Sequence, residues 1–241
     1  KQLGGSGGGH VAALYAPLPA SATHYFQQRL TGVSRSALFI GNGREARYYG
    51  CAEHLRWHGR ASFRYEGAWR LPAAPASLVR KLEHIGAVLA ARLHLRGCFG
   101  IDFLWREQRE PVLLDINPRP TATLELWPER QRMFDAHLAA CTDRMLLYSS
   151  PQVTHQRAHL VLYADAPWRV RKAMRWPPWI ADRPAAGALI PRGAPLCTVQ
   201  GEAATQTALV AQLRQRYAEL RTLLGATAQA VLPATIDIRS M

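Results

Sequence analysis

The chain has 241 residues, and its 30 Lys and Arg residues outnumber its 17 Asp and Glu residues, so the formal net charge is +13. A composition of 48% hydrophobic and 20% charged residues is typical of a folded globular protein and excludes an intrinsically disordered one. The sequence contains no run of about 18 apolar residues and therefore predicts no membrane-spanning helix.

A glycine-rich segment opens the chain: Lys-Gln-Leu-Gly-Gly-Ser-Gly-Gly-Gly-His-Val over residues 1–11. Glycines allow backbone N–H groups to approach phosphate oxygens closely, and a lysine adds positive charge. The segment is not a Walker motif, because no Gly-Lys-Ser/Thr follows the glycines. By itself it fits a phosphate-binding loop and a flexible linker equally well.

Short strands and then a helix are predicted over the first hundred residues. The strands, joined by Gly-containing turns, are Val11–Tyr15, His24–Leu30, Ser36–Gly41 and Ala46–Cys51. The helix begins at Pro75 and should end at Gly97. Its apolar residues recur at helical spacing and predict one buried face: Leu78, Leu82, Ile85, Leu89 and Leu93.

A β-hairpin is predicted next, because two apolar runs, Cys98–Trp105 and Pro111–Ile116, flank a short polar turn. Strand side chains alternate between faces, so Asp115 and Asn117 point the same way. If Arg106 pairs with Arg109 across the turn, Asp102 lies on that same face, opposite Leu113. Asp102 and Asp115 would then be diagonal neighbours, roughly 7–8 Å apart at Cα.

Three oxygen-bearing side chains on one face of a hairpin are what Mg²⁺ requires. The alternative is a polar strand edge that faces solvent. Beyond the hairpin, Asn-Pro-Arg-Pro ends the strand. A helix over Arg130–Tyr148 is then predicted to pack through these residues: Phe134, Leu138, Cys141 and Met145.

The last third of the chain predicts two strands, His159–Tyr163 and Pro195–Val199, and a helix over Ala203–Leu224. One stripe of that helix should be buried: Leu209, Leu213, Tyr217, Leu220 and Leu224. His54 and His58 are four residues apart, but the residues between them are not helical in pattern, which disfavours a zinc site.

The four cysteines are widely spaced and form no Cys-x-x-Cys: Cys51, Cys98, Cys141 and Cys197. This spacing argues against zinc and against a disulfide framework. We therefore expect buried free thiols and a cytoplasmic protein.

The lysine and glycine loop, together with the distant Asp…Asp-x-Asn-Pro-Arg hairpin, resemble the ATP-grasp superfamily. The resemblance implies an α+β fold with two subdomains gripping ATP and a small C-terminal domain. The N-terminal pre-ATP-grasp domain of the family is expected to be absent. The expected parts are 1–66 with the glycine loop, 67–150 with the metal-site hairpin, and 151–241 as a C-terminal α/β extension.

The resemblance also implies roles for individual residues. The residues implied to bind the nucleotide phosphates are Lys1, Gly5, Ser6, Gly7, Gly8 and Gly9. Those implied to bind the adenine are Gln27, Gln28 and Leu30. The residues implied to bind Mg²⁺, or Mn²⁺ in its place, are Asp102, Asp115 and Asn117. The implied catalytic residues are Arg119 and Lys1. Asp115 replaces the usual Glu, and the two glutamines replace an acidic residue, so an ordinary exposed strand pair remains the alternative for them.

The implied activity is an ADP-forming carboxylate–amine ligation through an acylphosphate. The Asp-Ile-Asn-Pro-Arg-Pro-Thr turn and the Pro-Leu-Cys-Thr-Val strand are most similar to tyramine–glutamate ligase-like enzymes of methanofuran or methylofuran biosynthesis. The expected partners are small-molecule acid and amine substrates and, if the chain self-associates, a second copy in a homodimer; no membrane partner is expected. One alternative is a non-catalytic ATP-binding module. Another is a basic nucleic-acid-binding domain, which the arginine excess suggests but no motif supports.

Overall fold

The computed structural model describes residues 1–3, 11, 23–56, 63–106, 110–142, 145–147, 154–171 and 174–225. The strands are β1 (Val33–Asn42), β2 (Ala46–His54), β3 (Gly67–Arg70), β4 (Arg96–Trp105), β5 (Val112–Asn117), β6 (Gln156–Tyr163), β7 (Trp168–Arg169), β8 (Ile180–Ala181), β9 (Leu189–Ile190) and β10 (Pro195–Ala203). The helices are α1 (Ala76–Leu93), the 3₁₀ turn η1 (Ala122–Leu126), α2 (Arg130–Thr142) and α3 (Gln206–Leu224). None of the described helices is long and apolar enough to cross a membrane.

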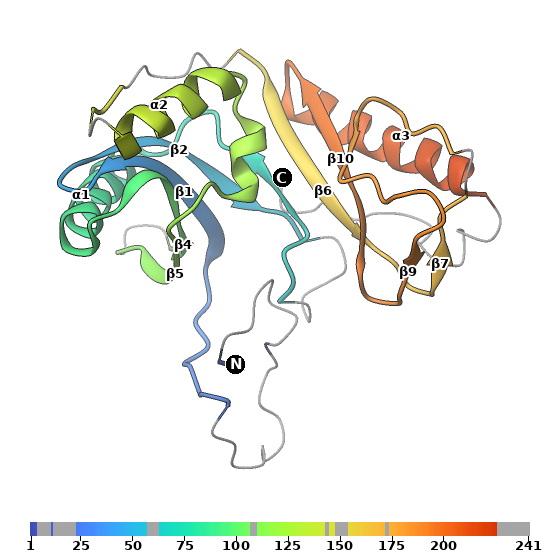
Figure 1. Cartoon of the computed structure of the whole chain (residues 1–241), viewed down its shortest axis with the longest axis horizontal. Coiled ribbons are helices and arrows are strands. Elements are labelled where there is room, and N and C mark those ends of the chain that lie inside the picture. Colours follow the sequence, from blue (N-terminus) through green and yellow to red (C-terminus); the bar gives the residue numbers. More distant parts are fainter. Residues whose placement is uncertain are drawn as a thin grey trace.

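One antiparallel sheet runs through the molecule in the order β5-β4-β1-β2-β3-β6-β10-β8. Figure 1 shows two lobes, one containing α1, α2 and the β5–β2 side of the sheet, the other containing α3, β6 and β10. The pairing of β3 with β6 joins the lobes. Strands from all three predicted parts of the chain share this sheet, and the predicted boundaries between those parts stay a prediction.

Two helices cover opposite faces of the sheet in the first lobe. Successive residues of β1 point to opposite faces. Phe39 packs with Leu78 and Leu82 of α1, whereas Leu38 packs with Met133 of α2. Both β1 side chains are almost fully buried.

The second lobe is built around α3, which begins at Gln206 and not at the predicted Ala203, the last residue of β10. The residues of α3 that are buried are those of the predicted stripe: Leu209, Leu213, Tyr217, Leu220 and Leu224. They pack against β6 and β10 through side chains such as Leu160 and Val199. Thr205 caps the helix, because its side chain accepts a hydrogen bond from the N–H of Ala208.

Two predicted helices differ in detail. The first ends at His94, in the left-handed conformation with φ 52°, and not at Gly97, which belongs to β4. In α2 the prediction named the wrong face, since Phe134 is 55% exposed and Leu138 44% exposed. The buried face of α2 is instead formed by Met133, Ala136 and Ala140. Small alanines let the helix approach the sheet, where a phenylalanine would hold it away.

The predicted strand His24–Leu30 is not formed. Residues 25–30 have no regular structure, and only an isolated bridge joins Gln2 to His24. The predicted strand Val11–Tyr15 lies, apart from Val11, outside the described residues. The free thiols are confirmed, with Cys51, Cys98 and Cys197 buried and Cys141 partly buried.

Candidate functional site

The β4–β5 hairpin is confirmed, but its register is not the predicted one. Asp102 lies directly opposite Asp115, and Phe103 takes Leu113 as its partner. A bulge between Asp102 and Phe103 leaves Leu114 as the extra residue. The two carboxylates therefore face each other across the ladder, at about 5 Å between Cβ atoms, and are not diagonal neighbours.

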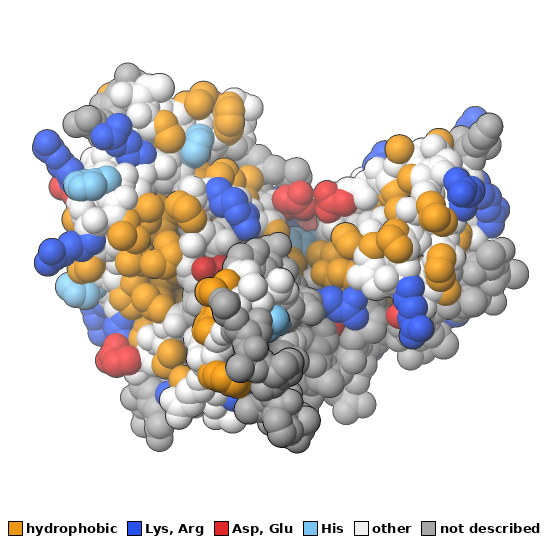
Figure 2. Space-filling view, turned by 60° about the horizontal axis from the view of Figure 1, so that its bottom comes forward, with side chains coloured by type: hydrophobic (Ala, Val, Ile, Leu, Met, Phe, Trp, Pro, Cys, Tyr) orange, Lys and Arg blue, Asp and Glu red, His pale blue; other side chains and the backbone are white. Residues whose placement is uncertain are grey.

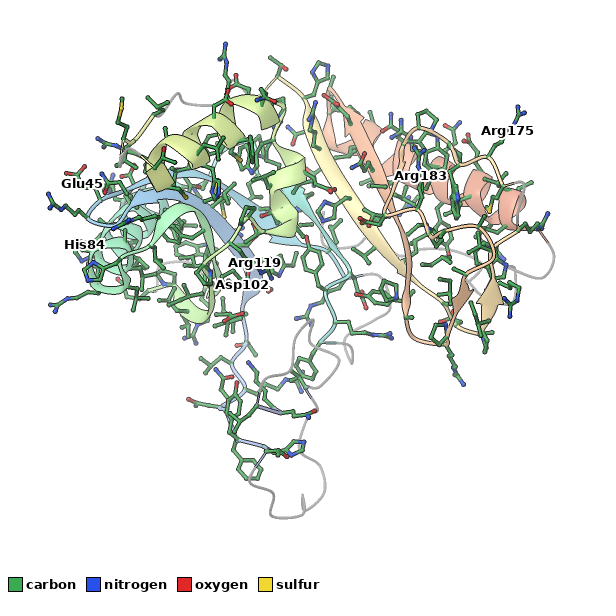
Figure 3. The ribbon with its side chains drawn as sticks, in the orientation of Figure 1. Glu45, His84, Asp102, Arg119, Arg175 and Arg183 are labelled. Carbon is green, nitrogen blue, oxygen red and sulfur yellow. The ribbon has the colours of Figure 1, made fainter. Side chains whose placement is uncertain are left out.

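Asn117 and Arg119 complete one cluster with these carboxylates. The Nδ2 of Asn117 donates to Oδ2 of Asp102 at 3.3 Å, and Nη2 of Arg119 donates to Oδ1 of Asn117 at 3.2 Å. Asp115 is exposed, and its Oδ1 accepts from the N–H of Ile116 at 2.9 Å. Figure 3 shows Asp102 and Arg119 side by side below the sheet. Four of the predicted site residues thus lie together.

The electrostatics of this cluster suit a divalent cation. Burial and, to a lesser extent, the charge of Asp115 raise the pKa of Asp102 to about 6, although the hydrogen bond from Asn117 and the charge of Arg119 act in the opposite direction. A bound cation would relieve the repulsion between the carboxylates. In the described part of the chain, no three His, Cys, Asp or Glu side chains come together to hold a metal. The site therefore offers two carboxylates and one amide, and Mg²⁺ would take its remaining ligands from water or phosphate oxygens.

A histidine from the neighbouring strands reaches the cluster. The Nε2 of His54, on β2, lies 3.8 Å from Oδ1 of Asp102, and the Oγ of Ser34, on β1, lies 3.0 Å from Nδ1 of His54. Burial lowers the pKa of His54 to about 4, assisted by His159 and Arg56. At neutral pH the contact is therefore between a carboxylate and a neutral imidazole, not an ion pair.

Tyr65 extends this contact toward the second lobe. Its ring stands edge-on to that of His54, with centroids 5.3 Å apart, and its hydroxyl is 2.7 Å from Nε2 of His159 on β6. Burial raises the pKa of Tyr65 well above its usual value of 10.0, so the side chain is a neutral phenol. A chain of polar groups thus runs from Asp102 through His54 and Tyr65 to His159. The sequence pattern did not single out Tyr65 or His159, because only the strand order makes them neighbours.

The predicted nucleotide-binding residues are not brought to this cluster by any contact among the described residues. The backbone of Lys1 pairs with that of Tyr25, the N-terminal ammonium donating to Tyr25 O at 2.9 Å. Gln27 and Gln28 are exposed and Leu30 is partly buried. Figure 1 shows the N-terminus on a projection below the lobes. The remaining residues of the predicted glycine loop lie outside the described residues: Gly5, Ser6, Gly7, Gly8 and Gly9.

Comparison with known proteins identifies a family model described as an ATP-grasp domain, which matches residues 1–123. Phosphoribosylamine–glycine ligase from Thermotoga maritima has a similar structure, with a TM-score of 0.60 at 17% identity, over 80% of this chain and 53% of that one. L-amino acid ligase from Bacillus licheniformis gives a TM-score of 0.59 at 10% identity, over 78% and 51%.

N5-carboxyaminoimidazole synthase from Aspergillus clavatus, in complex with ADP and 5-aminoimidazole ribonucleotide, gives a TM-score of 0.54 at 14% identity, over 78% of this chain and 51% of that one. No curated protein matches the chain. The chain spans about half the length of these solved structures. At such identities the likeness shows the fold alone, and that fold is the predicted one.

Proposed function

Because this chain belongs to the ATP-grasp family, we propose that it is an ADP-forming ligase that joins a carboxylate to an amine. A carboxylate oxygen of the first substrate attacks the γ-phosphorus of ATP, ADP leaves, and an acylphosphate forms. The nitrogen of the amine then attacks the acyl carbon, inorganic phosphate leaves, and the nitrogen gives up a proton. The observation that carries the proposal is the pair of opposed carboxylates, Asp102 and Asp115, with Asn117 and Arg119 beside them.

Each of these four residues has a role in the proposed reaction. Asp102, Asp115 and Asn117 would hold Mg²⁺, or Mn²⁺, which when bound with ATP neutralises phosphate charge. The guanidinium of Arg119 is exposed and adjoins Asn117, and we assign to it the transferred phosphoryl group. Positioning and charge neutralisation supply most of the catalysis in phosphoryl transfer, so no side-chain nucleophile is needed.

The nucleotide-binding residues of the proposal are those that the resemblance implied. Lys1 supplies a second cation for the phosphates. The glycine loop holds the phosphates through Gly5, Ser6, Gly7, Gly8 and Gly9, and the adenine contacts are Gln27, Gln28 and Leu30.

The proposed biological setting is the synthesis of a methylofuran-type one-carbon cofactor in the cytoplasm. It is supported by the Asp-Ile-Asn-Pro-Arg-Pro-Thr turn, which forms the end of β5 and the approach to η1. A glutamate-type acid would suit the arginine-rich charge of the chain.

A screen of acid and amine pairs for release of ADP from Mg-ATP tests the proposal. We expect ADP release that requires both substrates for full turnover and forms one amide per ADP. ATP binding without ADP release for any pair would indicate the non-catalytic module. Steeply salt-dependent binding to DNA or RNA, with no need for Mg-ATP, would indicate the nucleic-acid-binding domain.

A further inference from the structure

A cavity of about 180 Å³ lies where the second lobe meets η1, beside His159 and so at the far end of the polar chain from Asp102. β6, β10, α3 and η1 line it. Its charged lining residues are of both signs: Glu125, Arg157, Glu202 and Arg216. Figure 2 shows acidic side chains gathered in the hollow between the two lobes. Pockets for drug-sized ligands begin at about 300 Å³, so this cavity suits a smaller polar molecule.

Two of the four charges already neutralise each other. The Nη2 of Arg157 donates to Glu202 at 2.9 Å. Glu125 and Arg216 are not in an ion pair with any described residue. They are held by Gln200, whose side-chain amide donates to Oε2 of Glu125 at 3.2 Å and whose backbone carbonyl accepts from Nη1 of Arg216 at 2.6 Å. One carboxylate and one guanidinium, both hydrogen-bonded to Gln200, therefore remain available to a ligand.

Glu125 and Arg216 are both partly buried. Trp179 covers the guanidinium of Arg216, which lies 5.5 Å from the ring centroid, and burial lowers the pKa of Arg216 from its usual value. His159 is 2% exposed, and among the described residues its Nδ1 has no hydrogen-bond partner. Charges in such a partly dehydrated cavity interact with a ligand more strongly than charges in water.

We propose that this cavity binds the amine substrate as an α-amino acid, with its ammonium on Glu125 and its carboxylate on Arg216. The ammonium must lose one proton before its nitrogen can attack the acyl carbon, and the carboxylate of Glu125 accepts that proton. The assignment rests on the proposed ligase function, because it supplies the second substrate of that reaction. A free phosphate would meet repulsion from Glu125, and an amine without a carboxylate would meet repulsion from Arg216. A zwitterion presents one group to each sign of charge. The chain through Tyr65 and His54 then leads from the cavity to the hairpin cluster.

Calorimetric titration of the whole chain with glycine, L-alanine and L-glutamate tests the proposal, each compared with its N-acetyl and its carboxamide derivative. We expect at least one free amino acid to bind, and its two capped derivatives to bind at least tenfold more weakly. Glu125→Gln and Arg216→Gln should each weaken the free amino acid at least tenfold. Arg214→Gln, which alters an exposed arginine on the same helix, should leave its affinity unchanged.

Circular dichroism of each variant separates lost binding from lost folding, and the capped ligands test the charges without any substitution. The proposal is overturned if no free amino acid binds, if capped and free forms bind equally, or if both cavity variants keep full affinity. Amino acid binding without ADP release would support amino acid binding in the cavity and reject the ligase function. The opposite result is that amines lacking a carboxylate support ADP release that Glu125→Gln and Arg216→Gln leave unchanged. That result would be consistent with the ligase function and would reject amino acid binding in the cavity.

Discussion

Asp102 and Asp115 illustrate how one residue inserted in a strand changes the chemistry of a site. The bulge at Leu114 places the carboxylates directly opposite each other, and the partial burial of Asp102 makes their repulsion costly. Such a pair is unfavourable for stability alone, which supports a role in holding a cation.

The metal assignment predicts the effect of removing the exposed carboxylate. Asp115→Ala should abolish Mg-ATP turnover, a loss of about 100-fold or more, because part of the charge that positions the phosphates is gone. The variant should stay folded, because Asp115 is exposed and its removal relieves the repulsion of Asp102. Glu110→Ala, at the other end of the same hairpin, is the matched control and should keep full turnover. Full activity in Asp115→Ala would reject the metal assignment.

The raised pKa of Asp102 predicts a pH-dependent stability in the absence of divalent cations. Between its usual pKa of 3.8 and its folded value of about 6, the folded protein holds a proton that the unfolded chain releases. Stability therefore falls as the pH rises through this window, and it is level above it. The side chain is 31% exposed, so the effect should be discounted to about 1 kcal/mol.

Urea unfolding in EDTA across this pH range, with Asp102→Asn beside the unaltered protein, measures that effect. The variant should gain about 1 kcal/mol relative to the unaltered protein as the pH rises from 4 to above 6. A difference that stays constant with pH, or one that changes in the opposite direction, would contradict the raised pKa.

At the scale of elements, η1 lies between β5 and α2 in the chain, and its Glu125 accepts a hydrogen bond from Gln200 of the second lobe. Two contacts fix its position. The ring of Trp127, the residue after η1, lies against Gly50 of β2, where a Cβ would overlap it. Arg70 of β3 donates to the carbonyls of Leu126 and His155 and stacks on Trp127 at 5.3 Å. These contacts hold the segment that carries Glu125 over the sheet.

Gly50→Ala should destabilise the protein by about 3 kcal/mol, because the added methyl group displaces the Trp127 ring. Combining it with Trp127→Leu should recover part of that loss. In a double-mutant cycle followed by denaturant unfolding, we expect a favourable coupling of about 1–3 kcal/mol. Additive effects of the two substitutions would show that Gly50 and Trp127 are not in contact.

Arg70→Lys should cost about 3 kcal/mol, although the charge is kept. Arg70 is 1% exposed, and its guanidinium bonds two carbonyls that a single ammonium group does not reach together. Arg47→Lys, at an exposed position of β2, is the control and should change stability by less than about 0.5 kcal/mol. Equal unfolding temperatures for the two variants would show that the guanidinium of Arg70 is not needed for stability.

At the scale of the whole molecule, the net charge of +13 makes the compact state repel itself. Adding salt up to about 0.15 M should therefore raise the unfolding temperature, because screening weakens this repulsion. Thermal unfolding followed by circular dichroism at increasing NaCl concentrations measures the effect. A falling unfolding temperature would mean that ion pairs such as Arg35–Glu53, at 2.9 Å, outweigh the net repulsion.

Features that depend on local pattern could be predicted from the sequence. The β4–β5 hairpin and the buried stripe of α3 are confirmed, and so is the ATP-grasp fold, which the family resemblance had implied. Alternation in strands, 3.6-residue periodicity in helices and the short turn between two apolar runs all act between residues close in the chain. The same local pattern named Asp102, Asp115 and Asn117, and the family resemblance added Arg119. The structure brings these four residues together, while their roles stay a prediction.

Only the tertiary structure decided which distant residues meet those four. The bulge, the buried face of α2 and the order β4-β1-β2-β3-β6 depend on how side chains fill the space between elements, not on sequence spacing. That order brings His54, Tyr65 and His159 into one polar chain and places the cavity at its end. Packing between strands that are far apart in the sequence sets these contacts, and no periodicity along the chain encodes it.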